Sequence, residues 1–260
     1  GLVICGKAPI NKGVTASAEV SELTYGGTNS ADNSGSISYL RIEYSGYAYN
    51  SEKEFNGLSL FGVGKGTTIE YVQVYQGADD GFEFFGGTVD TRYLVSTSNE
   101  DDQFDWTEGW NGTNEFWFGK LGLGRGNRGI EADNNSNNHL AQPTSNPYIK
   151  NLTLVGLGDQ GTESQALKLR VGTKGIFENV VLSNFVTGID IQHTEGIGYV
   201  NSQEIKITNV RFVNVPSKAK GKDTAGATVD VNSVFTENDA ATGAGEGENM
   251  PSWTASWTRL

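Results

Sequence analysis

Four short stretches of this sequence repeat one pattern of an apolar, a polar and a second apolar residue: Gly57-Leu58-Ser59-Leu60, Gly81-Phe82-Glu83-Phe84, Gln103-Phe104-Asp105-Trp106 and Gly129-Ile130-Glu131-Ala132. The series continues with Ala166-Leu167-Lys168-Leu169 and Gly188-Ile189-Asp190-Ile191. Such alternation is typical of a β-strand with one buried face. Each stretch is too short to bury that face alone, so the pattern predicts strands that stack on their own repeats.

A second series of short strands alternates with the first along the chain. Its members are Tyr39-Leu40-Arg41-Ile42, Tyr71-Val72-Gln73-Val74, Tyr93-Leu94-Val95-Ser96, Glu115-Phe116-Trp117-Phe118, Asn151-Leu152-Thr153-Leu154, Asn179-Val180-Val181-Leu182 and Asn209-Val210-Arg211-Phe212. Within either series the repeat recurs about every 22 to 37 residues, the range of solenoid repeats. We therefore predict an all-β fold, a right-handed parallel β-helix of about seven to eight coils. An antiparallel sandwich is the alternative, but the Asn-Gly turns typical of its hairpins are scarce.

The composition agrees with a β-rich fold and argues against several functions. The 260 residues include 35 Gly and 1 Cys, and 31 acidic against 19 basic side chains give a formal net charge of −12. No apolar run approaches the roughly 18–20 residues of a membrane-spanning helix. Nucleic-acid binding is not expected, because it needs clustered Lys and Arg. The lone Cys5 excludes an internal disulfide and a thiolate zinc site. The two histidines, His139 and His193, lie far apart in the sequence, so a metal centre rich in histidine is not expected.

The repeats occupy most of the chain, so we predict one β-helix domain over residues 1–260. The expected departures from the repeat are a loop at 133–147, a long loop with one strand at 216–250, and a C-terminal cap at 251–260. The cap carries Trp253 and Trp257, and terminal repeats of a solenoid need such a cover.

Several phrases of the sequence together resemble a known family. They are Gly1-Leu2-Val3-Ile4-Cys5-Gly6-Lys7-Ala8-Pro9-Ile10-Asn11, Tyr25-Gly26-Gly27, Leu40-Arg41-Ile42-Glu43-Tyr44-Ser45-Gly46, Gly66-Thr67-Thr68-Ile69-Glu70-Tyr71-Val72-Gln73-Val74, Asp79-Asp80-Gly81-Phe82-Glu83-Phe84-Phe85-Gly86-Gly87-Thr88-Val89, Trp253-Thr254 and Trp257-Thr258. The chain resembles secreted Bacteroidetes surface proteins and lipoproteins with a right-handed β-helix and no assigned function, sometimes mislabelled as multidrug transporters. The resemblance implies the fold and a location outside the cell or on the outer-membrane surface. It also implies N-terminal coils of the same protein that would stack on residues 1–6.

The polar positions of the first series bring charges together. If successive strands stack in parallel, their outward side chains follow one another along one face as Ser59, Glu83, Asp105, Glu131, Lys168 and Asp190. The turns before these strands add Asp79, Asp80, Asp101, Asp102 and Arg128. Like charges directly opposite each other on neighbouring strands destabilise a sheet. The row therefore needs a bound cation, an intervening basic side chain or protonated acids.

Three interpretations of this acidic face remain open. In the first, it is a solvated surface whose turn Asp residues bond nearby backbone N–H groups. In the second, it holds Ca²⁺, which prefers several oxygen ligands. The candidate ligands are Asp79, Asp80, Glu83, Asp101, Asp102, Asp105 and Glu131. In the third, the face is catalytic.

A catalytic face would take one of two forms. An inverting glycoside hydrolase needs two carboxyl groups about 6.5–9.5 Å apart, which the stacking predicts for Glu83 with Asp105 or with Glu131. A polysaccharide lyase would use Ca²⁺ to neutralise a uronate carboxylate, with Lys168 or Arg170 as the base. The competing interpretation of these two basic residues is ion pairing with neighbouring acids.

Trp110, Trp117 and Arg128 are the candidate ligand-binding residues. Trp110 lies in a glycine-flanked turn, and strict alternation places Trp117 on the outer side of its strand. Both would then be available to stack on sugar rings, with packing beneath a neighbouring loop as the alternative. His193 is expected to be a surface residue without an acid–base partner.

These features predict an extracellular, surface-associated protein that binds carbohydrate or has a structural role. Ca²⁺ is the candidate cofactor, and a glycan or another cell-surface molecule is the expected partner; neither nucleic acid nor a membrane span is expected. The enzyme alternative is a polysaccharide hydrolase or a Ca²⁺-dependent polysaccharide lyase acting on the acidic face. A purely structural stalk or adhesin is the remaining alternative.

Overall fold

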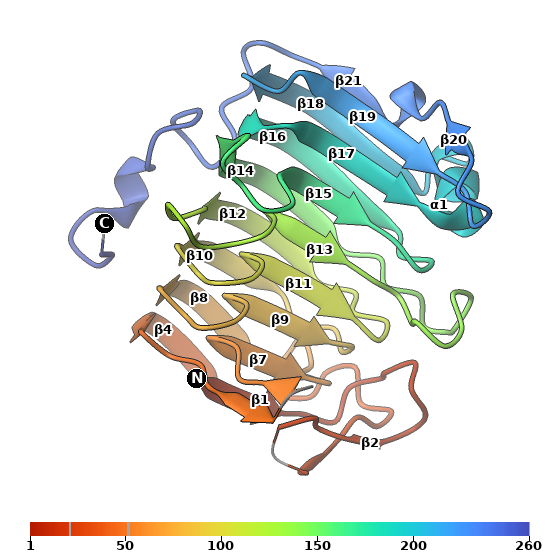
Figure 1. Ribbon diagram of the computed structural model, residues 1–260. Coiled ribbons are helices and arrows are strands. Elements are labelled where there is room, and N and C mark those ends of the chain that lie inside the picture. The colour runs from red at the N-terminus through yellow and green to blue at the C-terminus, as the bar shows by residue number, and fades with distance from the viewer. Residues whose placement is uncertain (21, 51–52, 260) are drawn as a thin grey trace.

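The computed structural model describes residues 1–20, 22–50 and 53–259, and most of its strands lie in two long sheets (Figure 1). The first sheet contains β1 (Leu2–Cys5), β7 (Leu58–Phe61), β9 (Phe82–Phe85), β11 (Phe104–Thr107), β13 (Ile130–Ala132), β15 (Gln165–Leu169), β17 (Thr187–Gln192), β19 (Ser217–Lys222) and β20 (Thr228–Val229). The second contains β4 (Ser36–Glu43), β8 (Thr68–Tyr75), β10 (Thr91–Thr97), β12 (Thr113–Lys120), β14 (Tyr148–Gly158), β16 (Gly175–Phe185), β18 (Ile205–Val213) and β21 (Phe235–Glu237). The remaining elements are the hairpins β2 (Ala16–Ser17) with β3 (Thr24–Tyr25) and β5 (Ala48–Asn50) with β6 (Lys53–Glu54), helix α1 (His193–Asn201), and 3₁₀ turns at Asn232–Val234 and Ser252–Thr254.

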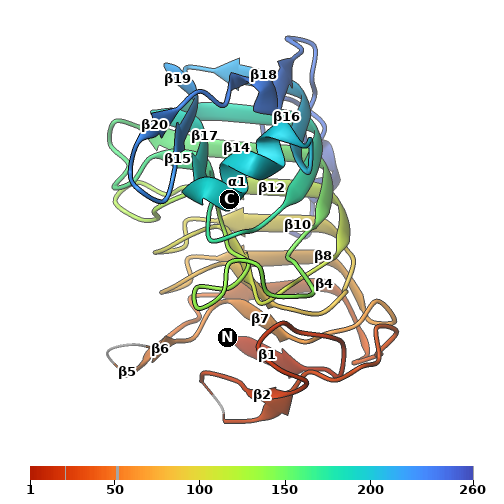
Figure 2. The same cartoon turned by 90° about the vertical axis from the view of Figure 1, so that its right-hand side faces the viewer.

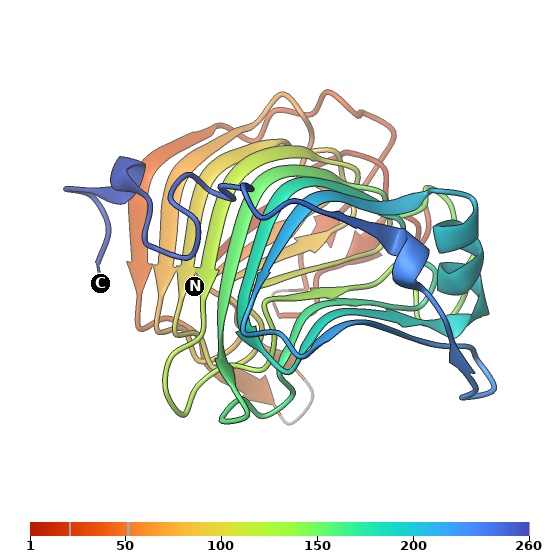
Figure 3. The same cartoon turned by 90° about the horizontal axis from the view of Figure 1, so that it is seen from above.

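The chain winds between the two sheets as a parallel β-helix (Figure 3). Between β4 and β19 the described residues pass from the second sheet to the first seven times, and each strand pairs in parallel with the strands of the coils before and after it. The prediction of an all-β, right-handed parallel β-helix is confirmed, and parallel pairing excludes the antiparallel sandwich. Only β19 and β20 pair antiparallel among the described strands of these two sheets.

The core follows from the apolar alternation in the first series. Leu58 aligns with Phe82, Phe82 with Phe104, and Phe104 with Ile130, so one inward position continues from coil to coil. All four side chains are fully buried. Backbone pairing at one coil spacing thus superposes equivalent apolar residues and buries them against one another.

The second sheet breaks strict alternation once in every coil. The residues at this corner have a left-handed backbone with φ between 53° and 60°, and they are Tyr39, Tyr71, Tyr93, Phe116, Asn151, Asn179 and Asn209. Two successive side chains, such as Glu115 and Phe116, consequently lie outside the core, and the next one, Trp117, points inward. The expected outward position of Trp117 is therefore wrong.

The corner residues form two stacks along the axis. The rings of Tyr39, Tyr71, Tyr93 and Phe116 stack with centroids 4.4–4.9 Å apart. Higher in the helix, Asn179 Nδ2 donates to Asn151 Oδ1 at 2.7 Å. Asn tolerates the left-handed conformation, and here its amide also satisfies a neighbour in the next coil.

The third side of the β-helix is formed by the segments that connect the strands and by the α-helix α1 (Figure 2). Residues 133–147 contain no helix or strand, as expected for a loop. Helix α1 follows β17 directly and contacts β17, β18 and β19. The prediction for 216–250 was incomplete, because β19 extends the first sheet by a full strand and β21 extends the second.

The C-terminal segment lies beside the helix and does not cover its end. Trp257 packs edge-on against Tyr39 and Tyr71, at centroid distances of 6.1 and 5.9 Å. The Arg259 N–H donates to Gln73 Oε1 at 2.6 Å. Residues 251–259 therefore run along the outer face of the second sheet, and the expected end cap is wrong (Figure 1). Its aromatic residues cover the stacked rings instead of the open end.

Replacing Trp117 tests the inward placement. Its side chain is fully buried, stacks on Phe104 at 4.5 Å and donates from Nε1 to Thr91 Oγ1 at 2.9 Å. We expect Trp117→Ala to lower the free energy of unfolding by about 3–5 kcal/mol, measured by denaturant titration. Leu123→Ala is the control, because Leu123 is 79% exposed. A Trp117→Ala protein of undiminished stability would contradict the buried placement.

Candidate functional site

The outer face of the first sheet carries the row of charges that the sequence predicted. Glu83 aligns with Asp105, Asp105 with Glu131, and Glu131 with Lys168, each one coil apart. Lys168 in turn aligns with Asp190. The backbone register fixes these neighbours, so the charged side chains cannot separate without breaking the sheet.

A second row lies in the turns that precede these strands. Asp80 Oδ1 accepts a hydrogen bond from the backbone N–H of Asp102 at 2.8 Å, and Asp102 Oδ1 accepts one from the N–H of Arg128 at 2.7 Å. Each carboxylate thus satisfies the turn of the next coil. This is the local reason for acids at these positions, and it leaves their second oxygens for other partners.

The part of the face around Glu131 is electrically compensated. Arg128 Nη1 lies 2.7 Å from Glu131 Oε1, Arg170 contacts Glu131 Oε2, and Lys168 Nζ lies 3.6 Å from Oε1. Arg170 Nε also donates to Asp133 at 2.7 Å. Burial alone would lower the pKa of Arg170, but the adjacent carboxylates outweigh it and raise the pKa. Arg170 therefore stays protonated and is a poor base for proton abstraction.

Arg128 is an internal counter-ion, and its expected role as a ligand-binding residue is wrong. Its side chain is 7% exposed and contacts Asp102, Glu131 and Glu163. The pKa of Arg128 is likewise raised, because these carboxylates outweigh the effect of burial. Its guanidinium has little surface left for a ligand.

The part of the face around Asp105 has no direct ion pair among the described residues. Carboxylate oxygens of Asp80, Glu83 and Asp105 lie within 4.8 Å of one another. Among the described residues no Lys, Arg or His lies within ion-pair distance of these three. We call these three residues the acidic triad. Two further groups of acids with the same spacing are Asp79–Asp80–Asp101 and Asp102–Asp105–Glu131, and Arg128 forms ion pairs with Asp102 and Glu131 of the second.

The pKa values of the triad reflect this lack of a cationic neighbour among the described residues. Burial raises the pKa of Asp105, and Glu83 and Glu131 raise it further. Burial also raises the pKa of Glu83, with a smaller contribution from Asp80. The pKa of Asp80 is raised by burial and by Asp105. Without a bound cation, the triad therefore retains protons to a higher pH than ordinary carboxyl groups.

Asn56 is a member of this site that the sequence reasoning missed. It is 1% exposed, and its Nδ2 donates to Glu83 Oε2 at 2.5 Å and to Ser59 Oγ at 3.1 Å. Its Oδ1 is buried without a hydrogen-bond partner. The signal was its position, because Asn56-Gly57 precedes its strand as Asp80-Gly81 precedes the next. Asn56 therefore holds the Glu83 carboxylate in place through its amide nitrogen.

Several other predicted roles do not fit this geometry. The nearest oxygens of Glu83 and Asp105 lie within 4.8 Å, which is shorter than the roughly 6.5–9.5 Å of an inverting hydrolase. The other predicted pair, Glu83 with Glu131 two coils away, stays a prediction. Trp110 and Trp117 are fully buried, so neither can stack on a sugar. Trp110 packs on Phe84 at 4.0 Å and donates to the carbonyl of Val89, because its turn folds inward onto the core.

The two histidines lie together although they are far apart in the sequence. Their ring centroids are 4.8 Å apart, His139 Nδ1 is 3.3 Å from Glu195 Oε2, and His193 Nδ1 accepts the N–H of Val171 at 3.0 Å. The expectation that His193 has no acid–base neighbour is therefore wrong. No sequence pattern joined these residues, because the loop at 133–147 brings His139 to the start of α1.

Comparison with known families agrees with the architecture. A family model described as "pectate-lyase like beta helix domain" matches residues 1–258. The chain belongs to this family. No curated protein and no solved structure matches it. Membership confirms the β-helix part of the resemblance noted in the sequence, while the Bacteroidetes origin and the surface location stay predictions. In the part of the chain that the structure describes, no helix has the length and apolar character needed to cross a membrane.

Because the pKa values of the triad are raised, the stability of the folded protein depends on the pH at which these acids lose their protons. In the folded protein these acids hold protons at a pH at which the unfolded chain has lost them, so their contribution to stability is complete below about pH 4 and declines as the pH rises. We expect Asp105→Asn to melt about 3–6 °C above the unaltered protein at about pH 8 in a chelator, and this gap to shrink at about pH 5. Thermal melts of both proteins measure this.

Asp159→Asn is the matched control, because Asp159 is exposed and lies outside the charged row. It should leave the melting temperature unchanged at both pH values. If the Asp105→Asn protein melts below the unaltered protein at the higher pH, a positive charge already stabilises the Asp105 carboxylate in the folded protein.

Proposed function

We propose that the outer face of the first sheet binds an acidic, uronate-containing polysaccharide through Ca²⁺ held by the acidic triad. The observation that carries the proposal is that oxygens of Asp80, Glu83 and Asp105 converge within 4.8 Å, while no Lys, Arg or His of the described residues forms an ion pair with them. Family membership connects this fold with polysaccharides. The proposal includes a location outside the cell, where polysaccharides and free Ca²⁺ are available.

The donor set favours Ca²⁺ over softer metals. The triad offers only carboxylate oxygens, and Ca²⁺ takes six to eight oxygen ligands from carboxylates, amides and water. The three side chains come from adjacent turns and strands of the β-helix, so the backbone holds them in place. Glu83 and Asp105 are partly exposed, which leaves room for ligands from a bound molecule.

A uronate carboxylate completes such a site. The ion supplies a positive charge where the isolated face would repel an anionic chain. Beyond it along the row stand Lys168 and Arg170, with side chains 12% and 32% exposed. They offer further contacts to a chain that runs along the helix axis.

A polysaccharide lyase on the same face is the second candidate, and Lys168 is the residue that favours it. Its contacts to Glu131 and Glu163, at 3.6 and 3.4 Å, are longer than the other contacts of the charged cluster. Proton abstraction requires a neutral base. The raised pKa values of Arg128 and Arg170 make them unsuited to that step.

Calcium binding is tested by thermal melting. A few millimolar Ca²⁺ should raise the melting temperature by about 5 °C relative to a chelator, since a ligand of the folded state stabilises it by RT ln(1 + [L]/Kd). The Asp105→Asn and Glu83→Gln variants should lose this shift, and the Asp159→Asn control should keep it. An equal shift in all four proteins would place the ion elsewhere.

Polysaccharide binding is tested by affinity electrophoresis through gels containing polygalacturonate, with a neutral glucan as the comparison. We expect retardation by polygalacturonate that requires Ca²⁺ and is lost in Asp105→Asn. Ultraviolet absorbance of unsaturated products in the same mixture would show lyase activity, which Lys168→Ala should remove. Retardation by the neutral glucan alone would contradict recognition through the ion, and no retardation by either would favour a structural stalk.

A further inference from the structure

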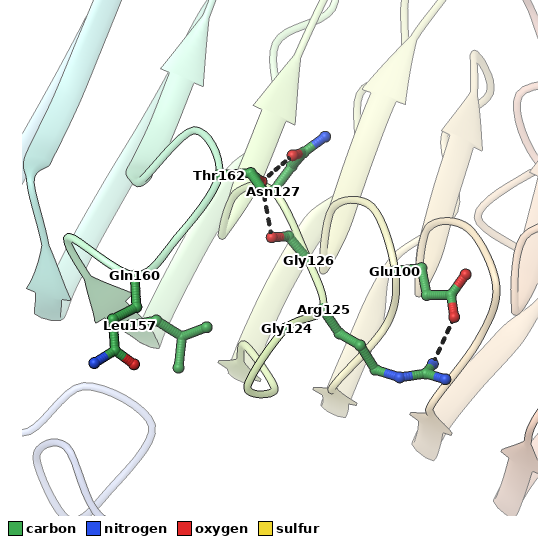
Figure 4. Close-up of a pocket in the computed structure, with 8 residues that line it drawn as sticks. All are labelled: Glu100, Gly124, Arg125, Gly126, Asn127, Leu157, Gln160 and Thr162. Atoms are coloured by element: carbon green, nitrogen blue, oxygen red, sulfur yellow. Dashed lines mark hydrogen bonds and ion pairs between the residues drawn. The ribbon is translucent and has the colours of Figure 1, made fainter.

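A cavity of about 290 Å³ lies beside the charged face, between the connections that lead from the second sheet to the first (Figure 4). Glu100 comes from the connection between β10 and β11, the glycine-rich segment 124–127 from that between β12 and β13, and Gln160 and Thr162 from that between β14 and β15. Leu157 supplies an apolar wall. A volume near 300 Å³ is at the lower end of small-ligand sites.

The inner wall of the cavity is continuous with the site of the acidic triad. Asn127 Nδ2 donates to Asp101, and Asn127 Oδ1 accepts a hydrogen bond from Thr162 Oγ1 at 2.5 Å. Asp101 belongs to a group of acids that shares Asp80 with the triad. The cavity therefore lies alongside the charged row, beside the coils that carry Asp105, Glu131 and Lys168, within reach of a sugar unit that projects from the face.

The chemistry of the cavity suits one acidic sugar unit. The guanidinium of Arg125 is 3.0 Å from Glu100, and the two side chains are 36% and 47% exposed. Exposed pairs of this kind contribute little free energy and exchange partners easily, and a guanidinium binds a carboxylate through two parallel hydrogen bonds. Leu157 faces the apolar side of a ring, while Gln160 and Thr162 offer polar groups to hydroxyls.

We propose that this cavity is an additional uronate subsite, in which Arg125 binds the carboxylate of a sugar unit beyond those on the face and Glu100 is displaced. The inference rests on the proposed function. Arg125 then distinguishes long chains from short ones, and the Glu100 carboxylate competes with the sugar carboxylate for the Arg125 guanidinium. A longer oligouronate therefore gains a contact that a short one lacks.

Isothermal titration in Ca²⁺ with trigalacturonate and hexagalacturonate tests the subsite. For Arg125→Ala we expect affinity for the hexamer to fall about tenfold, with affinity for the trimer unchanged. For Glu100→Gln we expect affinity for the hexamer to rise about two- to threefold, because the competing carboxylate is gone. Arg92→Ala is the control, because Arg92 pairs with Glu115 at 3.2 Å on the second sheet with similar exposure; it should change neither affinity.

The outcomes separate this inference from the proposed function. In one outcome, the unaltered protein binds both oligomers while Arg125→Ala weakens its affinity for the two equally or not at all. That result would overturn the subsite and leave the proposed binding on the outer face of the first sheet intact. A loss of affinity for the hexamer in Glu100→Gln would also overturn it, because the carboxylate would then assist binding. If neither oligomer binds the unaltered protein, the proposed function fails and the subsite fails with it.

Discussion

Parallel backbone pairing between successive coils is the constraint on which the rest of the molecule depends. Neighbouring coils are one strand spacing apart, so residues at equivalent positions share the same surroundings and become neighbours. Aromatic residues at one position stack, as Tyr71 does on Tyr93, and amides at the same position bond, as Asn179 does to Asn151. Acids at the outward position are held together in the same way, whatever their mutual repulsion.

The charged face therefore has two electrically different parts. Around Glu131, three basic side chains from its own and the next coil supply the compensating charge. Around Asp105, the positions equivalent to those three carry Asp102, Glu131 and Asp133, which are all acids. No basic side chain among the described residues forms an ion pair with Asp105, Glu83 or Asp80, so a bound cation or protons would supply the compensating charge. A site that exchanges protons for a cation gains affinity for that cation as the pH rises. Under the proposed function, this gradient along the row would orient a bound anionic chain, with the ion at one end and the basic side chains at the other.

The sequence correctly predicted the placement of side chains that follow the coil repeat. It misplaced side chains where the backbone departs from that repeat. Alternation located the inward Phe82 and the outward Glu83 correctly, because a strand has a period of two. It misplaced Trp117, because the left-handed backbone at Phe116 adds a residue to the outer side of each coil. The side-by-side placement of His139 and His193 and the path of the tail past Gln73 depend on long-range contacts that no local pattern encodes. Asn56 could have been found from its place before the strand, which matches that of Asp80.

The most direct test is a crystal structure of the unaltered protein at saturating Ca²⁺, with the ion identified by anomalous scattering. The account predicts one ion bound by oxygens of Asp80, Glu83 and Asp105 at about 2.3–2.6 Å. Short hydrogen bonds between the three carboxyl groups without an ion, or an ion bound only at other residues, would contradict it. In that event protons alone would hold the acidic triad together.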